Sequence, residues 1–397
     1  MLMPAVTATL AERIAHRLRA RDAVMRAFFA REAPRLARAA REIAARFERG
    51  GRLYAFGQGP YATDAAHVSV EFIHPVIVGK RALPALDASR APEAIAEALI
   101  GPDDVALAFG PPEGDPRDLR ALGIAARKGA YTLAWPGDDA DFAVDAPSDD
   151  AHVHQEAFEL LGHTLYESVH VFLEHGRALG EADVGASAFL YPYLGGDRPD
   201  AAAILDDVAG SILAKAEDAE RLRAQVAAEQ SDAIAAAILA MRERLDAGGR
   251  LLLFGNGGSA TDADDFALDC LDGGPGLAPI PAISLAGEPA VLSAIANDVG
   301  TELIFLRQLV AQARPADVAV AFSTSGGSKN VVAALEEAGK RGLVRVALLG
   351  YDGGEIVRRG LAEHAIVVRA QYVPRIQEAQ GAIYHVIRTA LGDALDA

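Results

Sequence analysis

The sequence has few of the residues that would place it outside a reducing compartment or in a membrane. Its single cysteine, Cys270, excludes an intramolecular disulfide. No uncharged apolar run approaches the roughly 18 residues that a membrane helix needs. The first residues mix charges into a helical pattern and lack the long apolar segment of a signal peptide. We therefore expect a cytoplasmic protein without a membrane partner.

Positive charge is also scarce, because the chain has 38 Lys and Arg residues against 55 Asp and Glu residues, which gives a formal net charge of -17. Such a chain repels phosphate backbones, which argues against nucleic acid as a partner. A small anionic substrate stays possible, because a local group of backbone N–H donors can bind it. The 397 residues, 51% of them apolar, are enough for two folded domains.

The most informative feature is an internal repeat. Residues 50–65 read GGRLYAFGQGPYATDA, residues 248–263 read GGRLLLFGNGGSATDA, and 11 of the 16 positions are identical. Two further pairs follow in the same order: DDVALAF (103–109) with ADVAVAF (316–322), and HQEAFELLGH (154–163) with IQEAQGAIYH (376–385). The chain is therefore two copies of one domain. We expect boundaries at 1–190 and 200–397, joined by a Pro- and Gly-rich linker near 187–202.

Each copy alternates short apolar runs with helical stretches, a pattern typical of an α/β fold with a parallel sheet between helices. A helix closed by a Gly pair comes first, and a Gly-rich turn and another helix follow the first apolar run. The expected strands are RLYAF, VALAF, AYTLAW and FAVDA in the first copy, and RLLLF, VAVAF, VRVALLG and HAIVV in the second.

Two loops of the second copy have the composition of a phosphate site. FGNGGSAT (254–261) lies between a strand and a helix, so that backbone N–H groups and the helix N-terminus can approach an anion. STSGGSKN (323–330) follows the next central strand and adds four hydroxyls. Ordinary N-capped turns are the alternative for either loop alone. The candidate phosphate ligands are Gly257, Gly258, Ser259, Ser323, Thr324, Ser325 and Ser328.

The first copy has lost this composition. Pro60 and Tyr61 stand where the second copy has Gly258 and Ser259. Its second loop, GPPEGD (110–115), has no hydroxyl and carries two acidic groups. We predict that this half does not hold phosphate through its own loops.

The first copy instead keeps a set of side chains suited to acid–base or metal chemistry. His67 and Glu71 are four residues apart on one helix, and Gln155 and His163 are eight apart on another, so that each pair shares a helix face. These side chains can bind zinc or a similar ion, or move a proton beside a carbonyl. Any one of them alone could be an ordinary packing residue. The second-copy equivalents are Asp265, Asp269, Gln377 and His385.

The motifs FGNGGSATDADDFALD, STSGGSKN and RIQEAQGAIYH resemble the sugar isomerase (SIS) domain of the phosphoheptose isomerase family. The resemblance covers nearly all of the second copy and, more weakly, the first. It implies two tandem SIS domains, each a five-stranded parallel sheet flanked by helices in a flavodoxin-like αβα arrangement. It also implies an isomerase that interconverts sedoheptulose 7-phosphate and glycero-manno-heptose 7-phosphate in heptose biosynthesis, often with bound zinc, as a homotetramer with active sites at subunit interfaces.

By this resemblance, the phosphate ligands are Ser259, Ser323, Thr324, Ser325 and Ser328. The resemblance also makes Glu71 and His163 the catalytic residues and His67 and Gln155 the metal-associated ones. We expect the full set, His67, Glu71, Gln155 and His163, to be able to hold the metal, with Asp265, Asp269, Gln377 and His385 at the same positions in the second copy. Asp265 and Asp269 depart from the family pattern. So do His152 and Pro374, which replace an acidic residue three before the family's glutamine.

The two copies have lost different parts of the family's site. One hypothesis is a composite site, in which the second copy holds phosphate while Glu71 and His163 transfer protons through an enediol. The opposing hypothesis confines the site to the second copy, with Asp269 and His385. Two copies per chain also imitate a dimer, so we expect a homodimer with four SIS domains.

Two functions of other classes remain open. Some SIS proteins bind sugar phosphates without turnover and act as regulators or scaffolds, which would suit the altered loops of the first copy. Retention of Glu71 and His163 argues against that function. Glucosamine-synthesising relatives also have tandem SIS domains, but they carry an N-terminal glutaminase with a nucleophilic cysteine, and this chain starts directly on the helix before its first domain.

Overall fold

The computed structural model describes residues 3–76, 79–177, 201–273 and 277–392. By its contacts the chain divides into two units: Ala23–Asp218, which holds the first copy, and Met1–Asp22 with Ala219–Ala397, which holds the second. The boundary expected between residues 190 and 200, and most of the linker expected at 187–202, lie outside the described residues. No helix in the described ranges combines the length and apolarity needed to cross a membrane.

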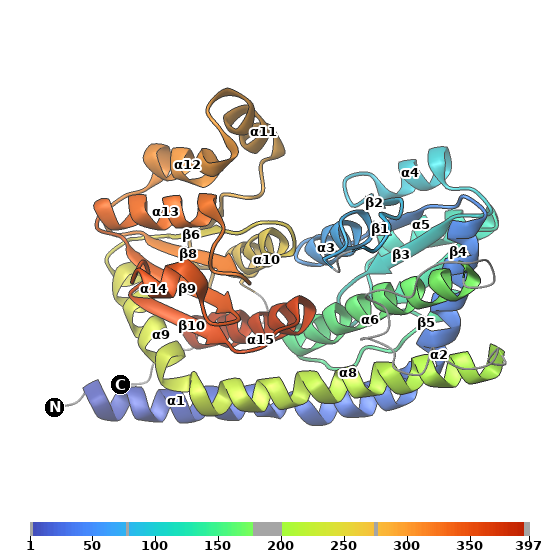
Figure 1. Cartoon of the computed structure of the whole chain (residues 1–397), viewed down its shortest axis with the longest axis horizontal. Coiled ribbons are helices and arrows are strands. Elements are labelled where there is room, and N and C mark those ends of the chain that lie inside the picture. Colours follow the sequence, from blue (N-terminus) through green and yellow to red (C-terminus); the bar gives the residue numbers. More distant parts are fainter. Residues whose placement is uncertain (1–2, 77–78, 178–200, 274–276, 393–397) are drawn as a thin grey trace. The chain divides into compact units, whose positions relative to one another are not determined.

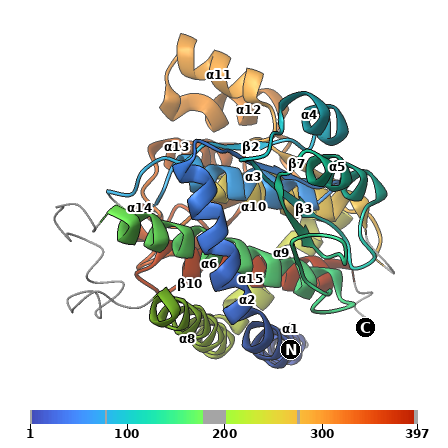
Figure 2. The ribbon, with the colours of Figure 1, turned by 90° about the vertical axis from the view of Figure 1, so that its right-hand side faces the viewer.

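The first copy is a five-stranded parallel sheet with the order β2-β1-β3-β4-β5. Helices α4 and α5 cover one face, and α2, α3 and α6 supply aromatic contacts on the other (Figures 1 and 2). Its elements are α2 (Asp22–Glu48), β1 (Leu53–Phe56), α3 (Tyr61–Ile73), β2 (Ala85–Asp87), α4 (Pro92–Leu99), β3 (Val105–Phe109), α5 (Pro116–Arg127), β4 (Tyr131–Trp135), β5 (Phe142–Ala143) and α6 (Ala151–Arg177).

The second copy repeats this sheet with the order β10-β9-β8-β6-β7, again all parallel. Its elements are α9 (Ser231–Asp246), β6 (Leu251–Phe254), α10 (Gly258–Asp272), β7 (Ala282–Ser284), α11 (Pro289–Asp298), the 3-10 turn η1 (Thr301–Leu303), α12 (Ile304–Gln312), β8 (Val318–Ser323), α13 (Lys329–Lys340), β9 (Val344–Gly350), α14 (Gly354–Arg358), β10 (His364–Val368) and α15 (Val373–Gly392). The two parallel sheets confirm the predicted fold class.

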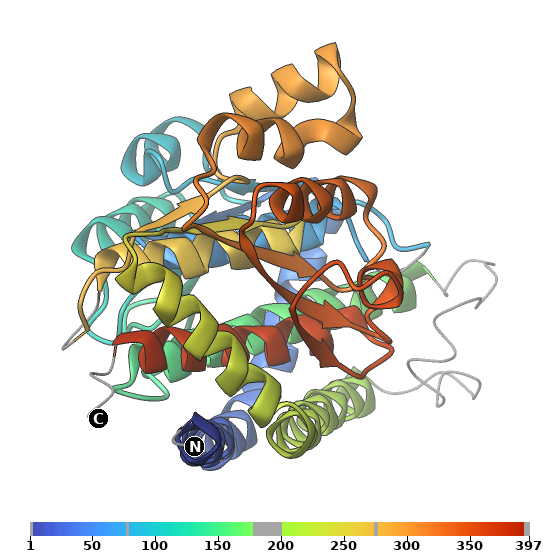
Figure 3. The same cartoon turned by 90° about the vertical axis from the view of Figure 1, so that its left-hand side faces the viewer.

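Alternating side chains of the central strands build the core on both faces of each sheet. In β6, Leu251 and Leu253 pack with α9, α10 and α15, whereas Leu252 and Phe254 pack with α12 and α13. Successive side chains of a strand point to opposite faces of the sheet, and both faces are covered by the apolar sides of helices. Each central strand therefore reads as an uninterrupted apolar run in the sequence. Figure 3 shows α13 and α9 on opposite faces of the second sheet.

One strand in each copy was not predicted from the sequence. β2 and β7 are edge strands of three residues each, too short to show a hydrophobic period. The fourth expected strand of the first copy, FAVDA, is shorter in the structure and spans only Phe142–Ala143. The second copy is longer than the first between the segment 248–263 and the segment 316–322. Its extra residues contain α11, η1 and α12, where the first copy has only α4.

The first helix of the chain, α1 (Met3–Ala20), packs with the second copy. Leu10, Ile14 and Leu18 repeat at every fourth position and lie buried in one cluster with Ile238 and Met241 of α9. The chain therefore starts in the unit of the second copy, passes to the first copy through α2, and returns within α8 (Ala201–Glu229).

Candidate active site

The first candidate phosphate loop joins β6 to α10 and allows close backbone approach. Gly257 has φ 58° and ψ -126°, a conformation that suits glycine. A Cβ at Gly255 would lie 2.3 Å from the carbonyl oxygen of Ser259, so the turn excludes any side chain there. Ser259 lies buried in the first turn of α10. The loop thus brings small residues and a helix N-terminus to the carboxyl end of β6.

The second loop joins β8 to α13 and is held by its own hydroxyls. Ser323 Oγ accepts a hydrogen bond from the N–H of Gly326 (3.1 Å), and Ser325 Oγ accepts one from the N–H of Gly327 (3.3 Å). Ser328 occupies the N-cap position of α13 without a side-chain capping bond, and it is only half-buried, as is Thr324. Hydroxyls at these positions can therefore reach a ligand at the carboxyl end of β8.

Two contacts that were not predicted from the sequence hold these loops in place. The side-chain amides of Asn256 and Asn330 exchange hydrogen bonds of 2.9 and 2.8 Å and join the two loops. A third loop, between β9 and α14, packs under the second: a Cβ at Gly326 would lie 2.2 Å from the carbonyl oxygen of Gly353. Both asparagines lie in the motifs already singled out, but their pairing needs the adjacency of β6 and β8.

In the first copy, large side chains occupy the corresponding region. Tyr61, at the position of Ser259, is buried with its ring edge-on to His154 at 5.9 Å. His154 Nε2 donates to the carbonyl oxygen of Gly110 (2.8 Å), at the position of Ser323. Burial lowers the pKa of this imidazole, so it is neutral near pH 7. Asp115 caps α5 by accepting from the N–H of Arg117 (2.8 Å). These contacts are consistent with the prediction that this half does not hold phosphate.

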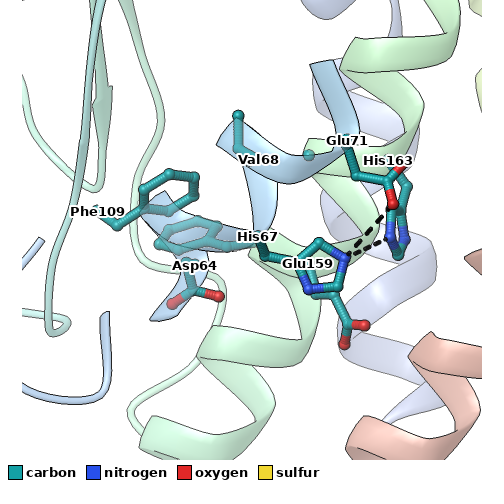
Figure 4. Close-up of a pocket in the computed structure, with 9 residues that line it drawn as sticks. Asp64, His67, Val68, Glu71, Phe109, Glu159 and His163 are labelled. Atoms are coloured by element: carbon teal, nitrogen blue, oxygen red, sulfur yellow. Dashed lines mark hydrogen bonds and ion pairs between the residues drawn. The ribbon is translucent and has the colours of Figure 1, made fainter. Parts of the chain in front are cut away.

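Helices α3 and α6 bring three of the four acid–base residues of the first copy together. His67 Nε2 lies 3.1 Å from His163 Nε2 and 3.9 Å from Glu71 Oε1, and all three side chains are buried (Figure 4). Gln155 lies two turns before His163 on α6, and its amide donates to Asp64 Oδ2 (3.1 Å). Asp64 was not predicted, although it lies in the ATDA segment that the two copies share.

The three ligand atoms of His67, Glu71 and His163 all lie within 4.8 Å of one another, which suits a shared metal ion. Two nitrogens bound to a tetrahedral zinc at about 2.0–2.1 Å are about 3.4 Å apart, close to the imidazole separation here. A cavity of about 10 Å³ adjoins the cluster, with Asp64, Phe109 and Glu159 among the residues that line it (Figure 4). That volume is about one water-sized sphere. The residues of the first copy therefore fit a metal of this kind.

The second copy forms a related cluster from α10 and α15. His385 Nε2 lies 3.5 Å from Asp265 Oδ2 and 3.4 Å from Asp269 Oδ2. Tyr384, which was not predicted, donates from its hydroxyl to Asp265 Oδ2 (2.6 Å). Burial, reinforced by the neighbouring Asp265, raises the pKa of Asp269 to about 6, with His385 acting in the opposite direction. Gln377 is buried on the same helix.

The class of the chain is that of the SIS-domain proteins, because the sequence model of the SIS domain matches residues 216–350, which lie in the second copy. The chain is 44% identical over 161 residues to phosphoheptose isomerase of Citrifermentans bemidjiense, a match that covers 40% of this chain and 82% of that protein. It is 39% identical over 179 residues to phosphoheptose isomerase of Leptospira biflexa, with 44% and 91% covered. The chain belongs to the phosphoheptose isomerase family.

A structural comparison extends the likeness to both copies. The C-terminal domain of glucosamine-fructose-6-phosphate aminotransferase from Francisella tularensis matches with a TM-score of 0.56 at 10% identity, over 91% of this chain and 93% of that one. This likeness shows the fold alone. It confirms that the tandem arrangement of two such sheets is one that a solved structure also has.

Proposed function

We propose that the chain is an aldose–ketose isomerase of a sugar phosphate, with sedoheptulose 7-phosphate as substrate and glycero-manno-heptose 7-phosphate as product. The observation that carries the proposal is the pair of loops at the ends of β6 and β8, braced by Asn256 and Asn330. The identity to phosphoheptose isomerases supports the choice of substrate. Backbone N–H groups of the two loops and the hydroxyls of Ser328 and Thr324 would bind the phosphate.

The acid–base residues that we propose are Glu71 and His163. Isomerisation of the ketose requires a base to take a proton from C1, which gives an enediol, and a proton to return at C2. It also requires a proton to move between the oxygens on C1 and C2. A carboxylate is a suitable base for carbon, and an imidazole can donate and accept in turn. Glu71 would take the carbon proton and His163 would move the oxygen proton.

A divalent metal, zinc in our proposal, would be held by His67, Glu71, Gln155 and His163, and it would supply a Lewis acid that polarises the carbonyl. Ligation through one oxygen of Glu71 would leave its other oxygen for proton transfer, and ligation through one imidazole nitrogen of His163 would leave its other nitrogen. The second-copy positions Asp265, Asp269, Gln377 and His385 are the alternative set, and the ligand atoms of Asp265, Asp269 and His385 also lie within 4.8 Å of one another. The metal-dependent part of the proposal is tested by comparing turnover with and without added zinc.

The experiment that tests the function is incubation of the purified chain with sedoheptulose 7-phosphate, followed by proton NMR of aldose formation. We expect an aldose signal that grows with enzyme concentration. Binding without conversion, seen as a thermal shift with the same ligand, would favour a sugar-phosphate-binding regulator. The contacts of Tyr61 and His154 favour that second candidate, because they occupy the region of the first copy that corresponds to the phosphate loops of the second.

We also infer a homodimer, in which two chains give four SIS domains. Two covalently joined copies replace two subunits of a single-domain relative. Light scattering coupled to size exclusion would give twice the chain mass of 41.5 kDa. A monomeric mass at the concentrations used for turnover would refute this inference.

A further inference from the structure

The cavity beside the first-copy cluster depends on a glycine. Val68, Phe109 and Gly162 line it together with His67 and His163. A Cβ at Gly162 would lie 3.2 Å from Val68 Cγ2, a tight contact, so even a small side chain there would press on the cavity wall. The space beside the two imidazoles therefore exists because residue 162 has no side chain.

The second copy has Tyr384 at the position of Gly162, directly before His385 as Gly162 is directly before His163. Its ring stacks on Phe266 at 5.5 Å and meets Phe322 edge-on at 5.8 Å. Phe266 and Phe322 are the repeat equivalents of Val68 and Phe109, two walls of the first-copy cavity. The ring of Tyr384 thus packs against the two residues whose first-copy equivalents line the cavity.

The hydroxyl of Tyr384 also engages the cluster itself. It donates to Asp265 Oδ2 at 2.6 Å, and this is the same oxygen that lies 3.5 Å from His385 Nε2. An ion shared by Asp265 and His385 would have to approach that oxygen beside the hydroxyl. In the first copy the equivalent atoms are two imidazole nitrogens 3.1 Å apart, at the edge of the cavity.

We propose that the chain binds one metal ion, in the first copy, and that Tyr384 keeps the second-copy cluster closed to an ion. Residue 162 and its equivalent 384 therefore decide which copy is metal-bound. The inference deepens the proposed function and rests on it for the role of the metal. The metal count itself is measured without substrate, so failure of the isomerase activity and failure of this inference are separate results.

The experiment measures zinc per chain by elemental mass spectrometry, after removal of bound metal with a chelator and reloading of the full chain. We expect one zinc per wild-type chain, none in His163→Ala, and one in the matched variant His385→Ala. Two ions in the wild type, or no ion at all, would overturn the proposal. So would loss of the ion in His385→Ala with retention in His163→Ala.

Two further variants test residue 384 directly. Tyr384→Gly should raise the count from one to two, because it restores the glycine of the first copy. Tyr384→Phe keeps the ring and should stay at one. A Tyr384→Gly chain that keeps its helical circular dichroism and still binds one zinc would refute the role of Tyr384. Visible absorption of Co²⁺ loaded in place of zinc gives a second readout, because His and carboxylate ligands change its spectrum.

Discussion

Asn256 and Asn330 exchange two side-chain hydrogen bonds, 2.9 and 2.8 Å long, and so connect the loop after β6 to the start of α13. The two residues are 74 positions apart in the chain. Each amide both donates and accepts, which fixes its orientation. The pair holds the two candidate phosphate loops at a constant separation before any ligand arrives.

Breaking this pair should weaken substrate binding more than it slows chemistry. Asn256→Ala removes both hydrogen bonds, each contributing about 1 kcal/mol. We expect KM for the sugar phosphate to rise about tenfold, with kcat changed less. The double variant Asn256→Ala/Asn330→Ala should be no worse than either single one, because both lose the same interaction. Asn297→Ala, in α11, is the matched control. An unchanged KM in Asn256→Ala would show that the brace has no role in binding.

Ser328→Ala tests the phosphate loop itself. Ser328 lies at the N-cap of α13 without capping the helix through its side chain, so its removal should leave the helix intact. A hydrogen bond to a charged group contributes about 1.5–3 kcal/mol, and we expect the Kd for inorganic phosphate to rise about 10- to 100-fold. Isothermal titration measures it. Ser293→Ala, on the exposed side of α11, should bind as the wild type does. Equal affinities of the two variants would count against this loop.

Glu71→Gln and Asp269→Asn form a matched pair that identifies the copy with the base. Each variant replaces a carboxylate, buried at Glu71 and partly buried at Asp269, by an amide of the same shape at the same repeat position. If Glu71 is the base, Glu71→Gln should lower kcat by about 10²- to 10⁴-fold, while Asp269→Asn stays within a few-fold. Turnover is followed by NMR at saturating zinc. The reverse result would place the base in the second copy. Unchanged turnover in Glu71→Gln would refute the hypothesis of a composite site that uses the base of the first copy.

Asp118 should make the first copy less stable as the pH rises. Burial raises the pKa of this carboxyl to about 6, while Gln58 donates to its Oδ1 (2.9 Å). Below about pH 4 the group is protonated in both folded and unfolded chains. Between about pH 4 and 6 only the folded form keeps the proton on Asp118. The free energy of unfolding of this unit therefore falls as the pH rises through the folded pKa of Asp118.

The neutral variant Asp118→Asn should therefore be more stable than the wild type at pH 7.5 by about 1–2 kcal/mol, after allowance for screening. This advantage should disappear near pH 4. Trp135, the single tryptophan, lies in β4 of the same unit and reports its unfolding by fluorescence. Asp138→Asn, which is exposed, is the control. If Asp118→Asn were more stable than the wild type by the same amount at both pH values, ionisation of Asp118 would not be the cause of the difference in stability.

Ile14→Ala should destabilise the second copy although residue 14 lies at the start of the chain. Ile14 is 1% exposed in the cluster with α9, and loss of such a side chain costs about 2–5 kcal/mol. Hydrogen exchange of α9 peptides should become faster, while the Trp135 unfolding transition stays in place. Glu12→Ala, on the exposed side of α1, is the control. Faster exchange confined to the first copy would contradict the packing of α1.

Much of the fold could be predicted because its signals are local. The apolar runs of β1, β3, β6 and β8 and the Gly-rich turns after them each lie within a few residues, and their repetition identifies the two copies. The edge strands β2 and β7 were missed because three residues carry no measurable period. The candidate residues His67, Glu71 and His163 were found because helical spacing places side chains on one face.

The sequence by itself determined the duplication, the parallel α/β class, and the residues at the strand ends where a ligand could bind. Tertiary structure decided what those residues contact. It paired Asn256 with Asn330, placed α1 against the second copy, and left a cavity at Gly162 while Tyr384 packs at its equivalent. These relationships join residues far apart in the chain, and they depend on packing and on the volume that each side chain fills, which local sequence patterns do not encode.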